Sequence, residues 1–377
     1  MEYKICKNCL MDSSDPDITF NESGVCSHCV DYFSKTLPYW EKLLSDKEGL
    51  LKLKNYIKKR SSNKSEYDCI IGLSGGIDSS YLLHLAVEEL SLKPLVFHVD
   101  GGWNSNVASN NIEKLIDKLN LDLYTEVINW KEMRDLQLSF FKSGVSQIDA
   151  PQDYAFFAAL YKYAYKFKIK TILTGGNFST ECIRNPISWM YFQSDDKQLR
   201  SIHKKFGKEK LKNFPKTHIL WHKFYLPLIK GIKIIKPLNF FNYNKEKAKK
   251  LLVEKYQWKP YPQKHFESRF TSFYEGYWLY ERFGFDVRRV QLSSLIVTNQ
   301  ITREEGLEIL KKSPMDLKKT KLEKQYIADK LRISTEELDR YFKMPIKTYK
   351  DYPNDSWLYS FGSKILRFFG KEIGGKL

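Results

Sequence analysis

The stretch Cys69-Ile70-Ile71-Gly72-Leu73-Ser74-Gly75-Gly76-Ile77-Asp78-Ser79-Ser80 decides the fold of this chain. Its apolar first half predicts a buried strand, and its second half predicts a glycine turn that opens a helix. Paired glycines let several backbone N–H groups converge on one oxyanion, and the positive end of the helix adds to that site. We predict an anion cradle formed by Leu73, Ser74, Gly75, Gly76, Asp78, Ser79 and Ser80, with Asp78 suited to Mg²⁺. The alternative is a generic glycine-rich turn. A Walker A loop is excluded, because no Gly-Lys-Ser/Thr occurs in the sequence.

Strands and helices alternate downstream of this loop. The pattern predicts strands over 93–99, 122–128, 170–173 and 236–238, and helices over 111–119, 130–141, 154–167 and 245–255. Alternation of this kind predicts an α/β fold with a doubly wound parallel sheet.

Two further loops follow predicted strands. Val99-Asp100-Gly101 ends the second strand, and Thr174-Gly175-Gly176 ends the fourth. Ligands of doubly wound sheets bind beyond the carboxyl ends of the strands, so we expect both loops to face the same crevice as the cradle and to contact a nucleotide or an activated carbonyl. Plain glycine turns are the alternative.

Four cysteines form two C-x-x-C pairs, Cys6/Cys9 and Cys26/Cys29, separated by sixteen residues. This spacing predicts a four-thiolate zinc ribbon with two short strands, which the metal would fold. A redox dithiol or an iron–sulfur site is the alternative.

The length of 377 residues favours two or three domains. We expect a zinc ribbon over 1–35, a helix and polar linker over 36–66, a catalytic domain with the anion cradle over 67–262 that has a substrate-site insertion at 178–231, and a helical C-terminal region over 263–377. The chain carries 62 Lys and Arg against 45 Asp and Glu, a net charge of +17 that suits nucleic acid, nucleotide-linked substrates or an anionic partner. No signal peptide or membrane span is visible, so we expect a cytoplasmic protein.

Lys264, His265 and Glu267 open the C-terminal region. Lys264 suits phosphate neutralisation, and His265 or Glu267 suits the transfer of a proton from an incoming amine. The alternative is a solvated helix face with ion pairs. The amphipathic tail over 357–369 would dock on protein, with a membrane surface as the alternative.

Ser-Gly-Gly-x-Asp-Ser after a buried strand is the PP-loop motif. The order of parts along the chain resembles the N-acetyl sugar amidotransferase family of the PP-loop ATP pyrophosphatase superfamily: the cysteine pairs, the PP-loop, Val99–Asn104, Thr174–Asn177, Lys264–Ser268, Arg288 and Ser293–Ile296. That family acts in lipopolysaccharide O-antigen and in pseudaminic and legionaminic acid biosynthesis, where it converts an acetamido group of a nucleotide-activated sugar into an acetamidino group. The resemblance implies an adenine nucleotide alpha hydrolase-like fold, the use of ATP and Mg²⁺, and an O-adenylated intermediate with release of AMP and pyrophosphate. It makes Asp78, Lys264, His265 and Glu267 catalytic candidates and adds Arg288 to the cofactor-binding candidates.

The reaction needs ammonia, and the sequence predicts that a partner supplies it. Residue 2 is Glu where an N-terminal-nucleophile glutaminase needs Cys, Cys69 lies inside the first strand, and Cys182 lacks flanking glycines. The resemblance implies a separate glutaminase and a cyclase-like subunit, and we expect no stable nucleic-acid complex.

The main rival is a PP-loop tRNA-modifying enzyme that thiolates or aminates a base, which the zinc ribbon and the positive charge would suit. A non-enzymatic nucleotide-binding scaffold is a third possibility, disfavoured by the intact Asp78 and Ser79.

Overall fold

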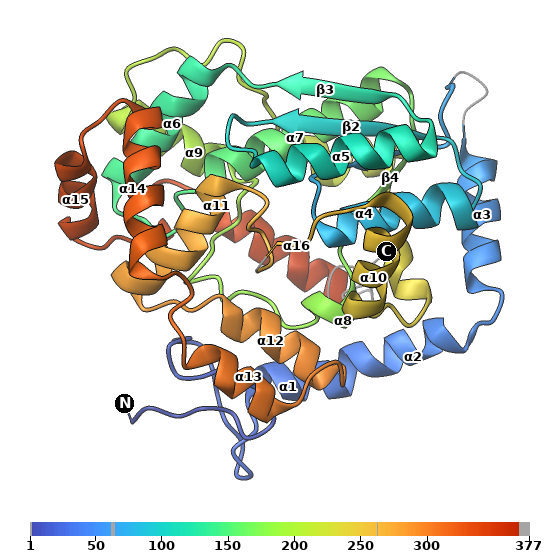
Figure 1. Ribbon diagram of the computed structural model, residues 1–377, viewed down its shortest axis with the longest axis horizontal. Helices are drawn as coiled ribbons and strands as arrows, with labels where there is room; N and C mark the ends of the chain where they lie inside the picture. Colours follow the sequence, from blue (N-terminus) through green and yellow to red (C-terminus); the bar gives the residue numbers. More distant parts are fainter. Residues whose placement is uncertain (1, 62–64, 262, 369–377) are drawn as a thin grey trace.

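The computed structural model describes residues 2–61, 65–261 and 263–368, so residues 62–64 of the predicted linker, residue 262 and the tail from 369 lie outside the described residues. Five parallel strands form one sheet in the order β3-β2-β1-β4-β5 (Figure 1). Their bounds are β1 Cys69–Gly72, β2 Pro94–Asp100, β3 Leu123–Val127, β4 Thr171–Leu173 and β5 Lys233–Ile235. The predicted α/β class is confirmed.

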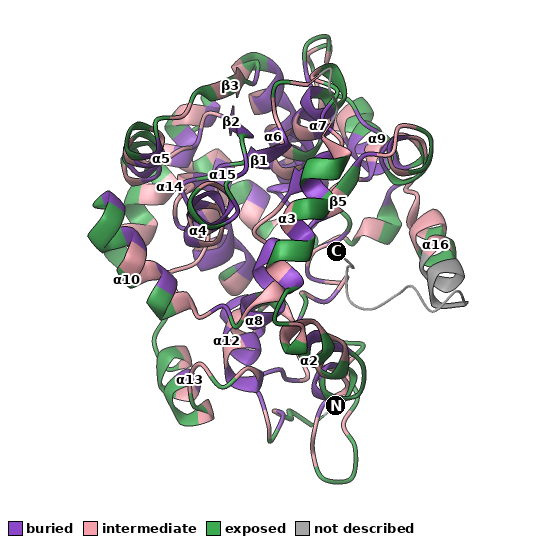
Figure 2. Cartoon of the chain, turned by 90° about the vertical axis from the view of Figure 1, so that its right-hand side faces the viewer, coloured by how far each residue is buried: buried purple, intermediate pink, exposed green. Residues whose placement is uncertain are grey.

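Helices cover both faces of the sheet because successive residues of its central strands point to opposite sides. Ile70 and Phe97 pack in one core with helices α6 (Trp130–Ser143) and α7 (Ala150–Lys166). Ile71 and Val96 pack in the other, with α4 (Ile77–His84), α5 (Asn106–Leu119) and α10 (Lys245–Tyr256). Figure 2 shows the central strands β1 and β2 buried between these layers. The sheet is therefore doubly wound.

The strand order reverses direction at β1. The chain runs outward from β1 through β2 to β3 and then returns to the other side of β1 with β4. Ligands of open α/β sheets bind at such a switch point, outside the carboxyl ends of the strands. The PP-loop after β1 and the second glycine pair after β4 both lie at this position.

The N-terminal region differs from its prediction. Isolated bridges, Ile5 with Asp12 and Phe20 with Cys26, stand where two short strands were expected. The single helix expected within residues 36–66 is two helices, because Asp46 accepts a hydrogen bond from the Glu48 N–H and turns the chain between them. The elements are α1 Ser27–Asp31, a π-helix over Tyr32–Thr36, α2 Leu37–Ser45 and α3 Gly49–Arg60.

The strand predicted over 236–238 lies three residues earlier in the structure, over Lys233–Ile235. β5 ends at Ile235, and Pro237–Phe240 forms a 3-10 helix, because proline has no N–H for the ladder. The insertion contains α8 Phe178–Glu181, α9 Asp196–Phe206 and a π-helix over Trp221–Ile229. Outside the insertion, a further π-helix covers Leu85–Glu89 directly after α4.

The C-terminal region is helical, as predicted. Its elements are α11 Arg269–Phe273, a π-helix over Tyr274–Phe283, α12 Arg288–Val297, α13 Arg303–Leu310, α14 Leu317–Leu331, α15 Thr335–Lys343, a 3-10 turn over Tyr349–Asp351 and α16 Ser356–Phe368. Thr302 starts α13 with a capping box to Glu305, and Asn244 caps α10. Among the described residues, no helix is both long and apolar enough to cross a membrane.

Candidate active site at the switch point

The PP-loop backbone is held by contacts that only glycine permits. Gly75 has a φ of +79°, and a Cβ there would lie 2.6 Å from the Ala108 carbonyl oxygen of α5. A Cβ on Gly76 would lie 2.7 Å from Glu267 Oε1. Gly75 is therefore required by its backbone, whereas a side chain at position 76 would displace the carboxylate of Glu267, a residue almost two hundred positions later.

The amides of the loop already face hydroxyl oxygens. The Gly76 N–H donates to Ser74 Oγ at 3.2 Å, and the Ile77 N–H donates to the Tyr261 hydroxyl at 2.7 Å. Ser79 Oγ lies 3.0 Å from Ser74 Oγ. Phosphate oxygens are acceptors of the same kind, so this arrangement suits an anion at the start of α4. Ser80, in contrast, is completely buried in α4 and does not face the loop opening.

Asp78 lies in the first turn of α4 and contacts the Lys264 ammonium. Its Oδ1 accepts a hydrogen bond from the Tyr243 hydroxyl at 2.7 Å, and its Oδ2 lies 3.4 Å from Lys264 Nζ. Lys264 Nζ lies 2.6 Å from Glu181 Oε1. Burial lowers the pKa of the Lys264 ammonium, but the negative charges of Glu181 and Asp78 outweigh burial and raise it above its usual value.

The two carboxylates around Lys264 fit a divalent cation. Mg²⁺ binds through one or two carboxylates together with substrate phosphates, and Asp78 and Glu181 already hold one cationic group between them. The sequence predicted Asp78 but missed Glu181. The feature that could have identified Glu181 in the sequence is its position, as a carboxylate shortly after the second glycine pair.

The second glycine pair touches the first loop. A Cβ on Gly175 would lie 2.9 Å from the backbone carbonyl carbon of Asp78, so the loop after β4 is in direct contact with the first turn of α4. Thr174 extends β4 through an N–H donated to the Ile235 carbonyl at 3.0 Å. The loop after β2 forms a turn in which Asp100 Oδ1 accepts from the Gly102 N–H at 2.7 Å, and Gly101 packs against Gln152.

The start of the C-terminal region crosses the loop after β2. Asn104 and Ser268 form a backbone bridge, and the Ser105 N–H donates to the Glu267 carbonyl at 3.0 Å. This pairing brings Glu267 to the PP-loop and His265 to the crevice. His265 has a φ of +67°, a strained conformation for a residue other than glycine.

His265 is paired with Glu275, whose Oε1 lies 2.8 Å from the imidazole Nδ1. Burial disfavours the imidazolium, but Glu275 outweighs burial and raises the pKa of His265 to about 9. His265 is therefore cationic near neutral pH. Burial raises the pKa of Glu267, and Glu267 Oε2 has no hydrogen-bond partner among the described residues.

These residues surround a cavity of about 590 Å³, which we call the strand-end cavity. Its walls come from the ends of β1 and β2, the start of α7 and the segment 265–275; lining residues include Leu73, Ser74, Val99, Gln152, Asp153 and Glu267. Burial raises the pKa of Asp153 to about 7. The volume suits a nucleoside. Sequence reasoning missed Asp149, Gln152, Asp153 and Glu275, which read as parts of helices.

Other predicted residues lie elsewhere. The buried Arg288 guanidinium contacts Asp286 at 2.7 Å and the Lys312 carbonyl at 2.7 Å, and so ties α12 to the end of α13. The structure does not bring it to the PP-loop. In the insertion, the large side chains of Trp189, Tyr191 and His222 are buried in packing. The residues of the insertion that line the strand-end cavity are instead Glu181, Asn185, Met190 and Gln193.

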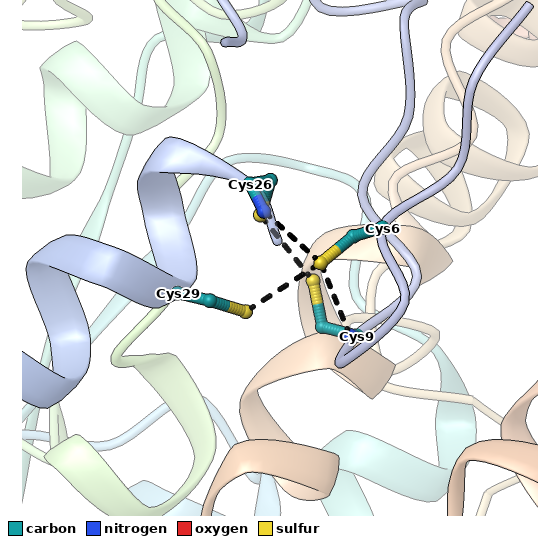
Figure 3. Close-up of side chains that lie close together, drawn as sticks. All are labelled: Cys6, Cys9, Cys26 and Cys29. Atoms are coloured by element: carbon teal, nitrogen blue, oxygen red, sulfur yellow. Dashed lines mark hydrogen bonds between the residues drawn. The ribbon is translucent and has the colours of Figure 1, made fainter. Parts of the chain in front are cut away.

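The four predicted metal ligands come together. Figure 3 shows Cys6, Cys9, Cys26 and Cys29 around one point, with Sγ distances of 3.9 Å for Cys6–Cys29 and 3.7 Å for Cys9–Cys26. Tetrahedral zinc with Zn–S bonds of about 2.3 Å separates its sulfurs by about 3.8 Å. All four sulfurs lie within 4.8 Å of one another, which fits a single ion better than a larger cluster.

The metal centre packs against α12 and α13. The Leu10 N–H donates to Ser293 Oγ at 3.0 Å, and Arg289 contacts Asp12 at 3.0 Å. Arg303 donates to the carbonyls of Cys6 and Cys9. The centre therefore supports helices of the C-terminal region, and Figure 1 shows the N-terminal segment beside them.

The parallel sheet, the glycine loop after β1 and the cavity at the strand ends define a PP-loop α/β protein. Residues 267–366 match the family model described as "LPS biosynthesis protein WbpG-like, C-terminal domain". This match confirms, over that region, the resemblance that the sequence motifs indicated.

Solved structures with distant similarity include three enzymes. An NMN synthetase from Francisella tularensis is 17% identical over 80% of this chain and 97% of its own, with a TM-score of 0.34. An NH3-dependent NAD synthetase from Campylobacter jejuni is 17% identical over 59% and 98%, with a TM-score of 0.29. The U34-tRNA thiolase NcsA from Methanococcus maripaludis is 15% identical over 70% and 80%, with a TM-score of 0.30. Similarities of this size assign neither activity nor substrate. The comparison with curated proteins gave no match.

Proposed function

We propose that this protein is an ATP-dependent amidotransferase. It converts the acetamido group of a nucleotide-activated sugar into an acetamidino group through an O-adenylated intermediate, and a partner glutaminase supplies the ammonia. One observation carries the proposal: the segment at which the WbpG-like match begins pairs with the loop after β2 and places Glu267 against Gly76 of the PP-loop.

The residues suit this chemistry because an amide oxygen is a poor leaving group. ATP supplies the adenylyl group that turns this oxygen into a leaving group, and Mg²⁺ held by Asp78 and Glu181 would neutralise phosphate charge. The PP-loop amides, the start of α4 and Lys264 bind the departing pyrophosphate. Lys264 occupies the space between Asp78 and Glu181, and the Ile77 N–H is bonded to the Tyr261 hydroxyl, so these groups exchange partners when Mg²⁺ and phosphate bind.

The pKa shifts divide the acid and base roles. A His265 side chain with a pKa of about 9 is protonated near neutral pH, so it donates a proton or stabilises negative charge. Glu267 has a raised pKa and an unpaired oxygen among the described residues, so it suits the acceptor role. When ammonia adds to the carbon, the C–O bond to AMP breaks and the nitrogen loses a proton to Glu267.

The tRNA-modifying alternative receives less support. Sulfur transfer would need reactive cysteines beside the loop. Outside the metal centre the chain has Cys69, buried inside β1, and Cys182, whose thiol lies 3.9 Å from the Ser294 carbonyl oxygen. Neither residue lines the strand-end cavity.

The test incubates the protein with ATP, Mg²⁺, ammonium and a panel of nucleotide-linked N-acetyl sugars. Mass spectrometry should show oxygen replaced by NH in one sugar, with AMP formed in equal amount. Formation of ADP, or AMP without sugar conversion, would contradict the proposal. Salt-sensitive tRNA binding without sugar turnover would favour the alternative.

A further inference from the structure

The lining of the strand-end cavity is acidic. No Lys or Arg is among the described residues that line it, but five carboxylates are: Asp149, Asp153, Glu181, Glu267 and Glu275. Glu181 is paired with the Lys264 ammonium at 2.6 Å. Glu275 is paired with the His265 imidazole at 2.8 Å. The remaining carboxylates outnumber the cations that the protein itself places against the cavity.

Asp149 and Asp153 are bonded to uncharged groups. Asp149 precedes α7 and accepts hydrogen bonds from Gln152 Nε2 at 3.1 Å and from the Thr271 hydroxyl at 2.7 Å. Asp153 lies in the first turn of α7 and accepts a hydrogen bond from Gln193. Burial and the negative charge of Asp153 raise the pKa of Asp149 well above its usual value, and burial raises the pKa of Asp153 to about 7. A bound cation would favour the ionised form of both carboxyl groups.

Two polar atoms beside these carboxylates have no partner. The Tyr274 hydroxyl and Glu275 Oε2 are shielded from solvent, make no hydrogen bond to the described residues, and belong to residues that are only 2% and 4% exposed. Burial raises the pKa of Tyr274, and three neighbouring carboxylates raise it further: Asp149, Glu275 and Asp153. The dipole of α7 would stabilise acidic residues at its start, but it satisfies neither of the two unpaired atoms. Unpaired polar atoms in residues that line a cavity indicate a missing ligand.

Aromatic rings lie next to the acidic residues. Phe156 and Phe157 follow Asp153 on α7 and line the same cavity, as does Tyr274. Carboxylates and aromatic faces together attract small organic and nitrogen cations. Mg²⁺ instead takes six oxygen ligands and keeps several of its waters. The ammonium ion carries four N–H donors and no acceptor, so it matches a wall of acceptor oxygens and ring faces.

We propose that Asp149, Asp153, Tyr274 and Glu275, which we call the acidic wall, bind the ammonium ion that supplies the nitrogen, and that Asp153 takes its proton. This inference rests on the proposed function and names where the nitrogen donor waits. Glu275 joins the acidic wall to His265, so the bound ion lies beside the catalytic candidates. The ribose of ATP is the competing occupant of these polar groups.

The proton transfer completes the chemistry of amidine formation. One N–H bond of the ammonium ion breaks, and its proton passes to the Asp153 carboxylate. The raised pKa of Asp153 makes it a stronger base than an ordinary carboxylate. The ammonia that remains forms a C–N bond to the adenylated carbon, and the C–O bond to AMP breaks with its electron pair on the AMP oxygen.

Binding of ammonium without turnover tests the inference. Isotopically labelled ammonium chloride is titrated at constant ionic strength, and its NMR signal gives the affinity with and without a saturating nonhydrolysable ATP analogue. Asp153→Asn should weaken ammonium binding at least about tenfold, and Tyr274→Phe about threefold, while affinity for the analogue stays within about twofold. The control Glu281→Gln removes an exposed carboxylate from the π-helix that carries Tyr274, and it should match the wild type.

Four outcomes would overturn the inference: no saturable ammonium binding to the wild type, displacement of ammonium by the analogue, unchanged ammonium affinity in Asp153→Asn, or an equal loss of affinity for ammonium and the analogue. If Asp153→Asn does not fold, the competition on the wild type and the Tyr274→Phe variant decide. Ammonium binding that depends on Asp153, without amidine formation from any sugar nucleotide, would refute the proposed function alone. Amidine formation with an unchanged ammonium KM in Asp153→Asn would refute the inference alone.

Discussion

Replacement of Glu275 by Gln should lower the pKa of His265. Glu275 is the main group that raises this pKa from 6.5 to about 9 against the effect of burial. A shift of about 2.5 units corresponds to about 3.4 kcal/mol. The His265 side chain is 41% exposed, so water screens the pair, and we expect about 1 to 2 kcal/mol in practice, a fall of about one pKa unit.

The same pair makes stability depend on pH. Because the pKa of His265 is raised in the folded state, its stabilisation is complete below about pH 6.5 and is lost as the pH rises through about 9. Glu275→Gln should therefore lower the free energy of unfolding at pH 6 and have less effect at pH 10.

Two measurements check this prediction. NMR titration of the imidazole protons, with His265→Asn for assignment among the seven histidines, gives the pKa directly. Urea unfolding at pH 6 and pH 10 gives the stability difference, with Glu281→Gln as control because Glu281 is an exposed carboxylate on the same π-helix. An unchanged pKa, or an equal loss of stability at both pH values, would show that the pair does not control His265.

Asp78→Asn should reduce AMP formation about 100-fold or more while circular dichroism stays unchanged, and Asp117→Asn on the exposed face of α5 should retain full activity. Equal losses of AMP formation in both variants would argue against a role of Asp78 in Mg²⁺ binding. Gly76→Ala should lower kcat about 100-fold, because a Cβ 2.7 Å from Glu267 Oε1 displaces that carboxylate, and a normal kcat would rule out this contact in the active enzyme. Cys26→Ser should lose one equivalent of zinc, measured by atomic emission, and should have lower solubility and a lower Tm. Retention of the metal with an unchanged Tm would exclude a structural metal centre.

The fold was largely predictable because its signals are local. The apolar run before Ser74 and the alternation after it predict a parallel sheet, and the cysteine spacing predicts the metal centre. The prediction failed where a proline interrupts an apolar segment, as at Pro237, and where helix breaks depend on one polar contact, as at Asp46.

The site was only partly predictable, because the residues that sequence reasoning missed look like ordinary helical residues until the chain folds. Asp149 and Asp153 read as the start of an apolar helix, and Glu275 reads as part of an aromatic one. Their function depends on the pairing of Asn104 with Ser268, a contact between segments more than 160 residues apart. At Arg288 the family resemblance implied a cofactor contact, whereas the folded chain pairs its guanidinium with Asp286.

Helix α12 joins the four-cysteine cluster to a cavity of about 350 Å³ that adjoins the strand-end cavity. Val290 and Gln291 of α12 line that cavity, and Ser293, one turn after Val290, accepts the Leu10 N–H of the first cysteine knuckle. The knuckle has too little apolar surface to fold without a metal, so we expect the position of α12 to depend on a metal held by the four cysteines, although no cysteine lines the cavity. Loss of that metal should therefore disturb the α12 side of the site, whereas the sheet supports the strand-end cavity. The two sides meet at His265, which lines both cavities and has a strained backbone.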